Sequence, residues 1–181
     1  MKCAICSEKI CLDGKGCKEL EGLNSKEENI NHYLNNEEDS KILKASDNIG
    51  KDISRLEEIA SYIKIMGIEK VGLAFCKGLK DETKLIHEFL EGKGIDSYSI
   101  ICGHAGIDKG ELGLSKSNSD FVVSCNPYGQ ANVLNNLKTE LNIAIGFCIG
   151  HDILFNKYSN APVTTFIVKD RVYKHCPIKA L

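Results

Sequence analysis

Apolar and polar positions follow two regular spacings between residues 52 and 168. Short runs rich in apolar residues predict four strands, at residues 70–76, 96–102, 142–148 and 163–168. Between them, apolar residues recur three or four positions apart, which predicts amphipathic helices starting at Asp52, near residue 79, at Asn126 and near residue 150. Strands that alternate with helices favour an α/β fold: a Rossmann-like, mostly parallel sheet of about four strands flanked by helices.

The chain divides by composition into three segments. Residues 1–22 are rich in cysteine and glycine, residues 23–51 form a polar tether with a short helix near 37–47, and residues 52–181 form the Rossmann-like domain. Residues 103–120 form a long loop rich in glycine and serine, and loops of this length in compact domains are usually functional or mobile.

The first segment holds a compact cysteine cluster, made of Cys3, Cys6, Cys11 and Cys17. Four thiolates within fifteen residues can surround one Zn²⁺ ion or hold an iron–sulfur cluster. A segment this short cannot bury a core of its own, so bound metal would supply its folding free energy. The sequence therefore predicts a metal-stapled segment; the alternative is a flexible tail whose thiols oxidise easily.

A second group of cysteines stands where predicted strands end: Cys76, Cys102, Cys125 and Cys148. The carboxyl ends of parallel strands meet at one edge of the sheet, which is where ligands bind in α/β folds. His151 follows Cys148 by three residues, at a spacing that suits a shared metal ion or a thiolate–imidazolium pair. We expect these residues to be further Cys/His ligands for Zn²⁺ or an iron–sulfur cluster. The plainer alternative is that these cysteines are small, inert core residues.

Composition excludes several classes of function. The net charge is −2 and the chain has two arginines, so nucleic-acid binding is disfavoured. No apolar run reaches the roughly 20 residues that cross a bilayer, and no secretory leader is evident, so we expect a cytoplasmic protein without a membrane partner. Neither the glycine pattern of NAD sites nor that of ATP sites is present. Nine cysteines in a reducing compartment favour metal ligation or catalysis over disulfides.

Several sequence motifs together resemble the DUF1847 family, whose members are described as uncharacterised metal-binding proteins of bacteria and archaea. The matching motifs are the four N-terminal cysteines, Gly72-Leu-Ala-Phe-Cys76, Gly106-Ile-Asp-Lys109, Cys125-Asn-Pro127, Gly146-Phe-Cys-Ile-Gly-His-Asp152, Tyr158-Ser-Asn-Ala-Pro-Val163 and Val168-Lys-Asp-Arg-Val172. The resemblance spans nearly the whole chain and implies metal binding, without implying a reaction. It does not extend to Cys176, which we leave outside the ligand set.

Three functional hypotheses follow. The first is a metal-binding protein with Zn²⁺ or an iron–sulfur cluster as its cofactor. The second is a thiol- or iron–sulfur-dependent enzyme in redox, sulfur-transfer or desulfuration chemistry, with Cys76, Cys125 or Cys148 as nucleophile or cluster ligand. The third is a zinc-stapled interaction module with inert core cysteines. The sequence identifies no catalytic residue, small-molecule or protein partner, and it leaves a homo-oligomer open.

Overall fold

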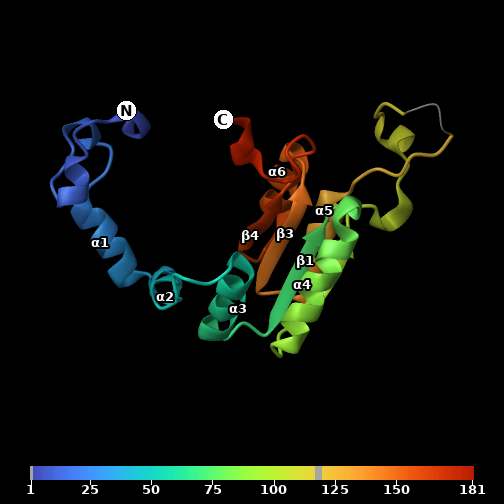
Figure 1. The fold of residues 1–181 in the computed structure, drawn as a ribbon, viewed down its shortest axis with the longest axis horizontal. Helices are drawn as coiled ribbons and strands as arrows, with labels where there is room; N and C mark the ends of the chain where they lie inside the picture. Colours follow the sequence, from blue (N-terminus) through green and yellow to red (C-terminus); the bar gives the residue numbers. More distant parts are fainter. Residues whose placement is uncertain (1, 117–119) are drawn as a thin grey trace. The chain divides into compact units, whose positions relative to one another are not determined.

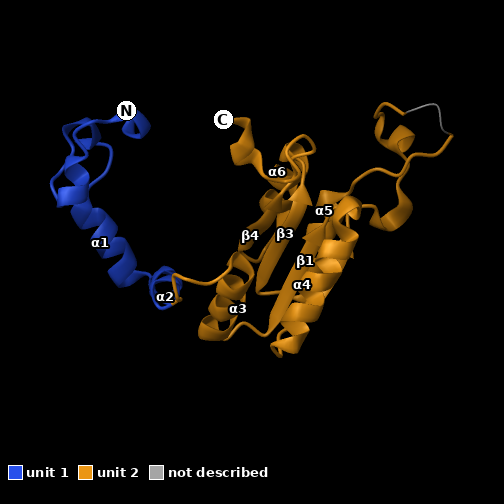
Figure 2. Ribbon diagram, viewed as in Figure 1, with its two compact units in different colours: residues 1–48 blue, residues 49–181 orange. Residues whose placement is uncertain are grey.

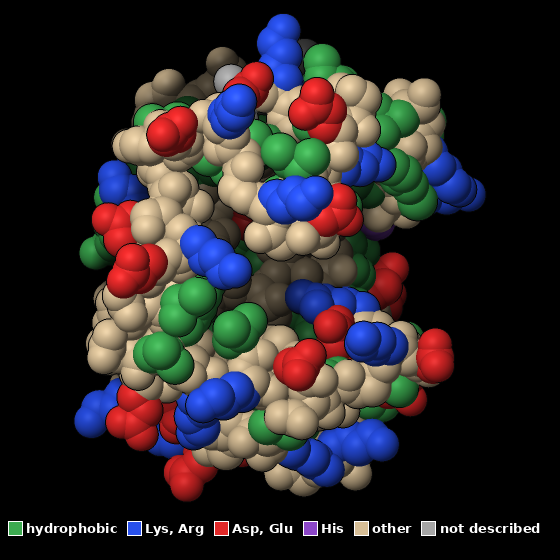
Figure 3. Space-filling model, turned by 90° about the vertical axis from the view of Figure 1, so that its left-hand side faces the viewer, with side chains coloured by type: hydrophobic (Ala, Val, Ile, Leu, Met, Phe, Trp, Pro, Cys, Tyr) green, Lys and Arg blue, Asp and Glu red, His purple; other side chains and the backbone are tan. Residues whose placement is uncertain are grey.

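The computed structural model describes residues 2–116 and 120–181 of the chain. The protein consists of two compact units, residues 1–48 and residues 49–181, which are coloured separately in Figure 2. Acidic and basic side chains are interspersed over the face shown in Figure 3. In the part of the chain that the structure describes, no helix has both the length and the apolar character needed to cross a membrane.

The first unit contains short 3-10 turns followed by two helices. The turns span Cys3–Ile5, Ile10–Asp13 and Lys18–Leu20, and the helices are α1 (Lys26–Asn35) and α2 (Glu37–Asp47). Helix α2 matches the short helix predicted near residues 37–47, whereas α1 occupies residues that we assigned to a tether. Ser25 caps α1 by accepting a hydrogen bond from the Glu28 amide. We did not predict this helix because its sequence has few apolar residues.

The second unit is built on a four-stranded, fully parallel sheet in the order β2-β1-β3-β4, of which Figure 1 labels β1, β3 and β4. The strands are β1 (Lys70–Phe75), β2 (Asp96–Ile101), β3 (Leu141–Phe147) and β4 (Val163–Val168). The helices are α3 (Arg55–Met66), α4 (Lys80–Gly92), α5 (Pro127–Leu137) and α6 (Ile149–Tyr158). The Rossmann-like α/β fold predicted from the sequence is therefore confirmed.

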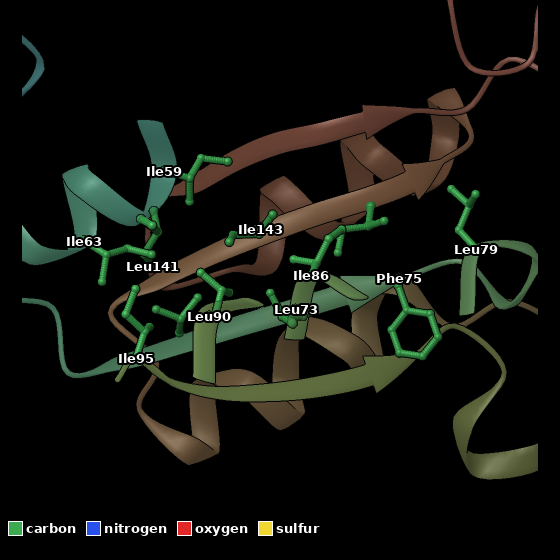
Figure 4. Packing of buried hydrophobic residues seen from close by; sticks show 13 residues of the cluster. Ile59, Ile63, Leu73, Phe75, Leu79, Ile86, Leu90, Ile95, Leu141 and Ile143 are labelled. Atoms are coloured by element: carbon green, nitrogen blue, oxygen red, sulfur yellow. The ribbon is translucent and has the colours of Figure 1, made fainter. Parts of the chain in front are cut away.

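Helices cover both faces of this sheet, which gives three layers. Strand β1 alternates between the layers: Leu73 joins α3 and α4 in one core, and Ala74 joins α5 and α6 in the other. Figure 4 shows the first core, where Ile86 of α4 lies over the sheet beside Leu73. Gly72 permits the close approach of α5, because a Cβ atom at this position would overlap the Leu134 side chain. Burial on both faces explains why β1 and β3 are mostly apolar.

One local prediction about a helix start differs from the structure, whereas α4 begins at Lys80, close to the start predicted near residue 79. Ser54 caps α3, not Asp52: its side chain accepts from the Glu57 amide, and the Glu57 carboxylate accepts from the Ser54 amide. This reciprocal pair satisfies two free amides and outweighs the single cap that Asp52 could provide. A 3-10 turn, Lys77–Leu79, precedes α4, so the chain turns sharply directly after β1. Helix α5 begins at Pro127 behind Asn126, as predicted.

The sheet has its topological switch point between β1 and β3. From β1 the chain passes to β2 on one side, and then returns to add β3 and β4 on the other. At such a point the connections leave the carboxyl ends of the two strands in opposite directions and open a crevice between them. The segments that start at Cys76 and Cys148 border this crevice.

Candidate functional site

The four sheet-edge cysteines follow, or lie beside, the carboxyl ends of the strands. The amide of Cys76 donates to Ile145 O at 3.0 Å, and that of Cys102 donates to Phe75 O at 2.9 Å. Both residues therefore continue the hydrogen-bond ladder one position beyond their strands. Cys148 follows β3 directly as the N-cap of α6. Cys125 lies next to Asn126, whose amide donates to Cys102 O at 2.7 Å.

Cys102 and Cys125 form a thiol pair, with their Sγ atoms 3.7 Å apart. The Cys102 side chain is buried, with 3% of its surface exposed, and the Lys77 amide donates to its Sγ atom at 3.3 Å. Cys125 is only partly buried. The pair thus consists of one enclosed sulfur and one sulfur that is more open.

The two thiols of this pair have opposite shifts in pKa. A hydrogen bond from Cys102 favours the thiolate of Cys125 and lowers the pKa of Cys125 to about 7, although burial and the neighbouring Cys76 and Cys148 oppose this shift. The positive charge of Lys77 adds to the lowering. The pKa of Cys102 is raised, first because its proton is held in the bond to Cys125 and second because the sulfur is buried. Near neutral pH, about half of Cys125 is therefore ionised, and Cys125 ionises before Cys102.

The other two thiols are each paired with a cation from the segment that follows β4. Lys169 Nζ donates to Cys76 Sγ at 2.6 Å, and Arg171 donates to Cys148 Sγ at 3.4 Å. Positive charge at this distance stabilises a thiolate. Neither cation was predicted from the sequence to belong to the site. The available signal was their position, because basic residues at the carboxyl end of a parallel strand share an edge with the predicted thiols.

His151 lies in the first turn of α6 and has a lowered pKa. The first cause is burial, and the charges of Lys169 and Arg171 add to it, since all three disfavour the imidazolium ion. The neutral imidazole that results is the form that binds metals. His104 lies just after β2, and its Nδ1 donates to Ile101 O at 3.0 Å.

A buried glutamine is hydrogen-bonded to the backbone near the ends of two strands. Gln130 of α5 is fully buried, and its Nε2 donates to Phe75 O at 3.1 Å and to Ile100 O at 2.8 Å. Phe75 is the last residue of β1 and directly precedes Cys76, and Ile100 lies near the end of β2, two residues before Cys102. Gln130 therefore fixes the backbone that carries both thiols. This role of Gln130 was not predictable from the sequence, because the two hydrogen bonds depend on how α5 packs on the sheet.

The N-terminal cysteines lie in the first unit and show less burial. Cys3, Cys6 and Cys11 are exposed, and Cys17 is partly buried. A 3-10 turn closes the Cys3/Cys6 pair, because the Cys6 amide donates to Cys3 O at 3.2 Å. The two neighbouring hollows of this segment share Cys17: one is lined by Cys11, the other by Cys3 and Cys6. Among residues 2–44 no side chain is buried, as expected for a segment without a core of its own.

The described side chains do not yet form a complete ligand set. Within residues 2–116 and 120–181, no group of three or more His, Cys, Asp or Glu side chains is placed to hold one metal ion. The sulfurs of Cys76 and Cys148 are directed to cations, and those of Cys102 and Cys125 to each other. The structure thus brings the predicted sheet-edge thiols to one edge as a pair flanked by two single thiols, each beside a cation.

The chain is similar to proteins that are described as uncharacterized or of unknown function. An uncharacterized protein of Methanocaldococcus jannaschii is 45% identical over 180 residues, which cover 97% of this chain and 90% of that protein. Residues 17–166 match the family described as a protein of unknown function, DUF1847. The matched residues include Cys17 and all four sheet-edge cysteines, and they begin after Cys11. From the extent of this match and the resemblance of its motifs, the chain belongs to the DUF1847 family.

Proposed function

We propose that this chain is a metal-binding protein whose sheet edge binds a soft metal ion or an iron–sulfur cluster through Cys76, Cys102, Cys125 and Cys148. The observation that carries the proposal is the 3.7 Å separation of the Cys102 and Cys125 sulfurs. Two thiolates bound at about 2.3 Å with tetrahedral angles lie about 3.8 Å apart on one Zn²⁺ ion. The innermost pair therefore has the spacing of two ligands on a shared ion.

The charges around the site support the same function. A site with four thiolates carries an excess of negative charge over a divalent ion, and burial makes that excess costly. Lys169 and Arg171 contact the two outer thiols and supply positive charge where it is needed. Such partners around the ligands tune affinity in metal sites generally. Ligation would draw the Cys76 and Cys148 sulfurs inward, and the neutral His151 is a further candidate ligand.

The four N-terminal cysteines are the second site of the proposal. Cys3 and Cys6 share a tight turn, and the 2–44 segment buries no side chain that could hold it together. Metal affinity would then provide its folding free energy. Thiolate ligands accept both Zn²⁺ and iron–sulfur clusters, so the metal has to be identified by measurement. Nine cysteines without a disulfide fit a cytoplasmic protein, which is part of the proposal.

A second candidate function, a thiol-dependent enzyme, is favoured by one observation. The pKa of Cys125 is lowered to about 7, which makes about half of this thiol a nucleophilic thiolate at neutral pH. Redox or sulfur-transfer chemistry needs such a group. The third candidate, an interaction module with inert core cysteines, would leave this shift and the two thiol–cation contacts without a role.

The deciding experiment is metal analysis with an absorption spectrum on protein purified without oxygen and without a metal-binding tag. The double variant Cys102→Ser/Cys125→Ser should lose the metal of the sheet edge, whereas the matched control Cys176→Ser should retain it. Iron and sulfide with a broad brown absorbance would identify a cluster, and colourless zinc would identify a zinc site. Equal metal content in the double variant and the control would refute the sheet-edge site.

A further inference from the structure

Two backbone segments hold Cys102 and Cys125 side by side. The Asn126 amide donates to Cys102 O at 2.7 Å, so the chain after β2 and the chain before α5 are hydrogen-bonded neighbours. The next residue continues the contact, because a Cβ atom at Gly103 would lie 3.4 Å from Val123 Cγ2. Adjacent backbones of this kind place two Cα atoms within the 4.4–6.8 Å range that disulfides span.

The two sulfurs are also close to bonding distance. Their separation of 3.7 Å exceeds the roughly 2.05 Å of a disulfide by less than 2 Å, a gap that side-chain rotation can close. Neither thiol is bonded to another cysteine in the structure. The closed ring would contain residues 102–125 and would fasten the base of the long loop between them.

The two thiols of the pair differ in exposure, and this difference sets which of them reacts first. Cys125 is partly exposed and can meet a small molecule, whereas Cys102 is enclosed and has 3% of its surface exposed. The Lys77 amide, at 3.3 Å, donates to Cys102 Sγ and can stabilise negative charge there. An external reagent should thus react at Cys125 first, with Cys102 as the second, internal nucleophile.

We propose that Cys102 and Cys125 are a redox-active dithiol that exchanges with a low-molecular-weight disulfide. The Cys125 thiolate attacks one sulfur of the disulfide RSSR, the S–S bond breaks, and one RS⁻ leaves with its electron pair. Cys102, after giving its proton to solvent, attacks Cys125 Sγ, forms the internal disulfide and releases the second RS⁻. Two electrons pass from the pair to RSSR, and the protons lost by the two cysteines convert both RS⁻ ions to RSH.

This activity does not require the proposed metal site. A bound ion would occupy the same sulfurs and compete with exchange, so the two functions can be measured separately in one preparation. If exchange occurs in a chain that never binds metal, only the metal proposal fails. If metal binds and no internal disulfide forms after its removal, only the present proposal fails.

The test uses the full chain, treated anaerobically with a chelator and then with oxidised glutathione. Peptide mapping by mass spectrometry should find a disulfide that joins the Cys102 and Cys125 peptides. The variant Cys102→Ser should instead accumulate glutathione on Cys125, because the internal nucleophile is gone. The variant Cys125→Ser should show little glutathione on Cys102, and the control Cys176→Ser should give the same Cys102–Cys125 disulfide as the unaltered chain.

Peptide mapping of the unaltered chain tests the dithiol proposal even if a variant fails to fold. Glutathione retained on Cys125 without transfer to Cys102 would overturn the proposal, and so would a disulfide from Cys125 to any other cysteine. The exposed Cys3, Cys6 and Cys11 serve as internal markers that the reagent was active.

Discussion

Lys169 Nζ donates to Cys76 Sγ at 2.6 Å, although the two residues are 93 positions apart in the chain. Lys169 follows β4 and Cys76 follows β1, and β3 lies between these strands in the sheet. The contact therefore spans the switch point, where α/β folds bind their ligands. It gives one outer thiol of the candidate site a charge partner from the far side of the crevice.

Replacing Lys169 by Met should weaken metal binding at the sheet edge about 10- to 100-fold, the usual effect of losing a partner of a metal ligand. The physical reason is that the Cys76 thiolate would lose the positive charge that offsets it. Lys169→Arg should keep most of the affinity, because it keeps the charge. Competition with a chelator of known affinity measures both variants, and equal affinity in Lys169→Met and the unaltered chain would contradict the assigned role.

Alkylation of Cys125 should reach half of its maximal rate near pH 7, since its pKa is lowered to about 7. The thiolate is the reacting form, so the rate rises as pH increases through this pKa and falls in acid. An unperturbed thiol would reach the same point near pH 8.5, at about 30-fold lower proton concentration. Iodoacetamide labelling followed by peptide mapping gives the profile, with the urea-unfolded chain as control. Coinciding profiles for the folded and the unfolded chain would rule out the shift.

Gly146→Ala should destabilise the second unit by about 2 kcal/mol or more. Gly146 has a φ of +71°, and an added Cβ would overlap Leu79 Cδ1 in the core. The residue lies in β3 where the register with β4 shifts, so the backbone cannot easily adopt another conformation. Urea unfolding measures the change. Gly150→Ala is the matched control, because its added methyl meets nothing within 4 Å and alanine favours the helix. A similar loss of unfolding free energy in both variants would count against this explanation.

The double variant Cys3→Ser/Cys6→Ser should lower bound metal while the second unit keeps its stability. The reason is that the first unit has its own contacts and the proposed staple lies wholly within it. Metal analysis and urea unfolding of the same protein test both parts. Unchanged metal content would exclude the N-terminal site, and a large loss of stability in residues 49–181 would show that the units depend on each other.

Local sequence determined most of the second unit. Strands β1 and β3 were predictable because residues buried on two sides must be apolar, and α5 because Asn126 and Pro127 form a strong helix start. The parallel order of strands then required Cys76, Cys102 and Cys148 to lie at one edge. Helix α1 was not predictable in this way, since its apolar positions are few and its cap was not distinguished from the surrounding polar residues.

The sequence by itself thus determined which residues end the strands, and with them which thiols share an edge of the sheet. Only the tertiary structure decided how those thiols are partnered: Cys102 with Cys125, Cys76 with Lys169, and Cys148 with Arg171. The physical reason is the separation along the chain over which each interaction acts. Hydrophobic periodicity and helix caps act over a few residues, whereas these contacts join segments separated by 23 or 93 positions and depend on the packing of strands and loops between them.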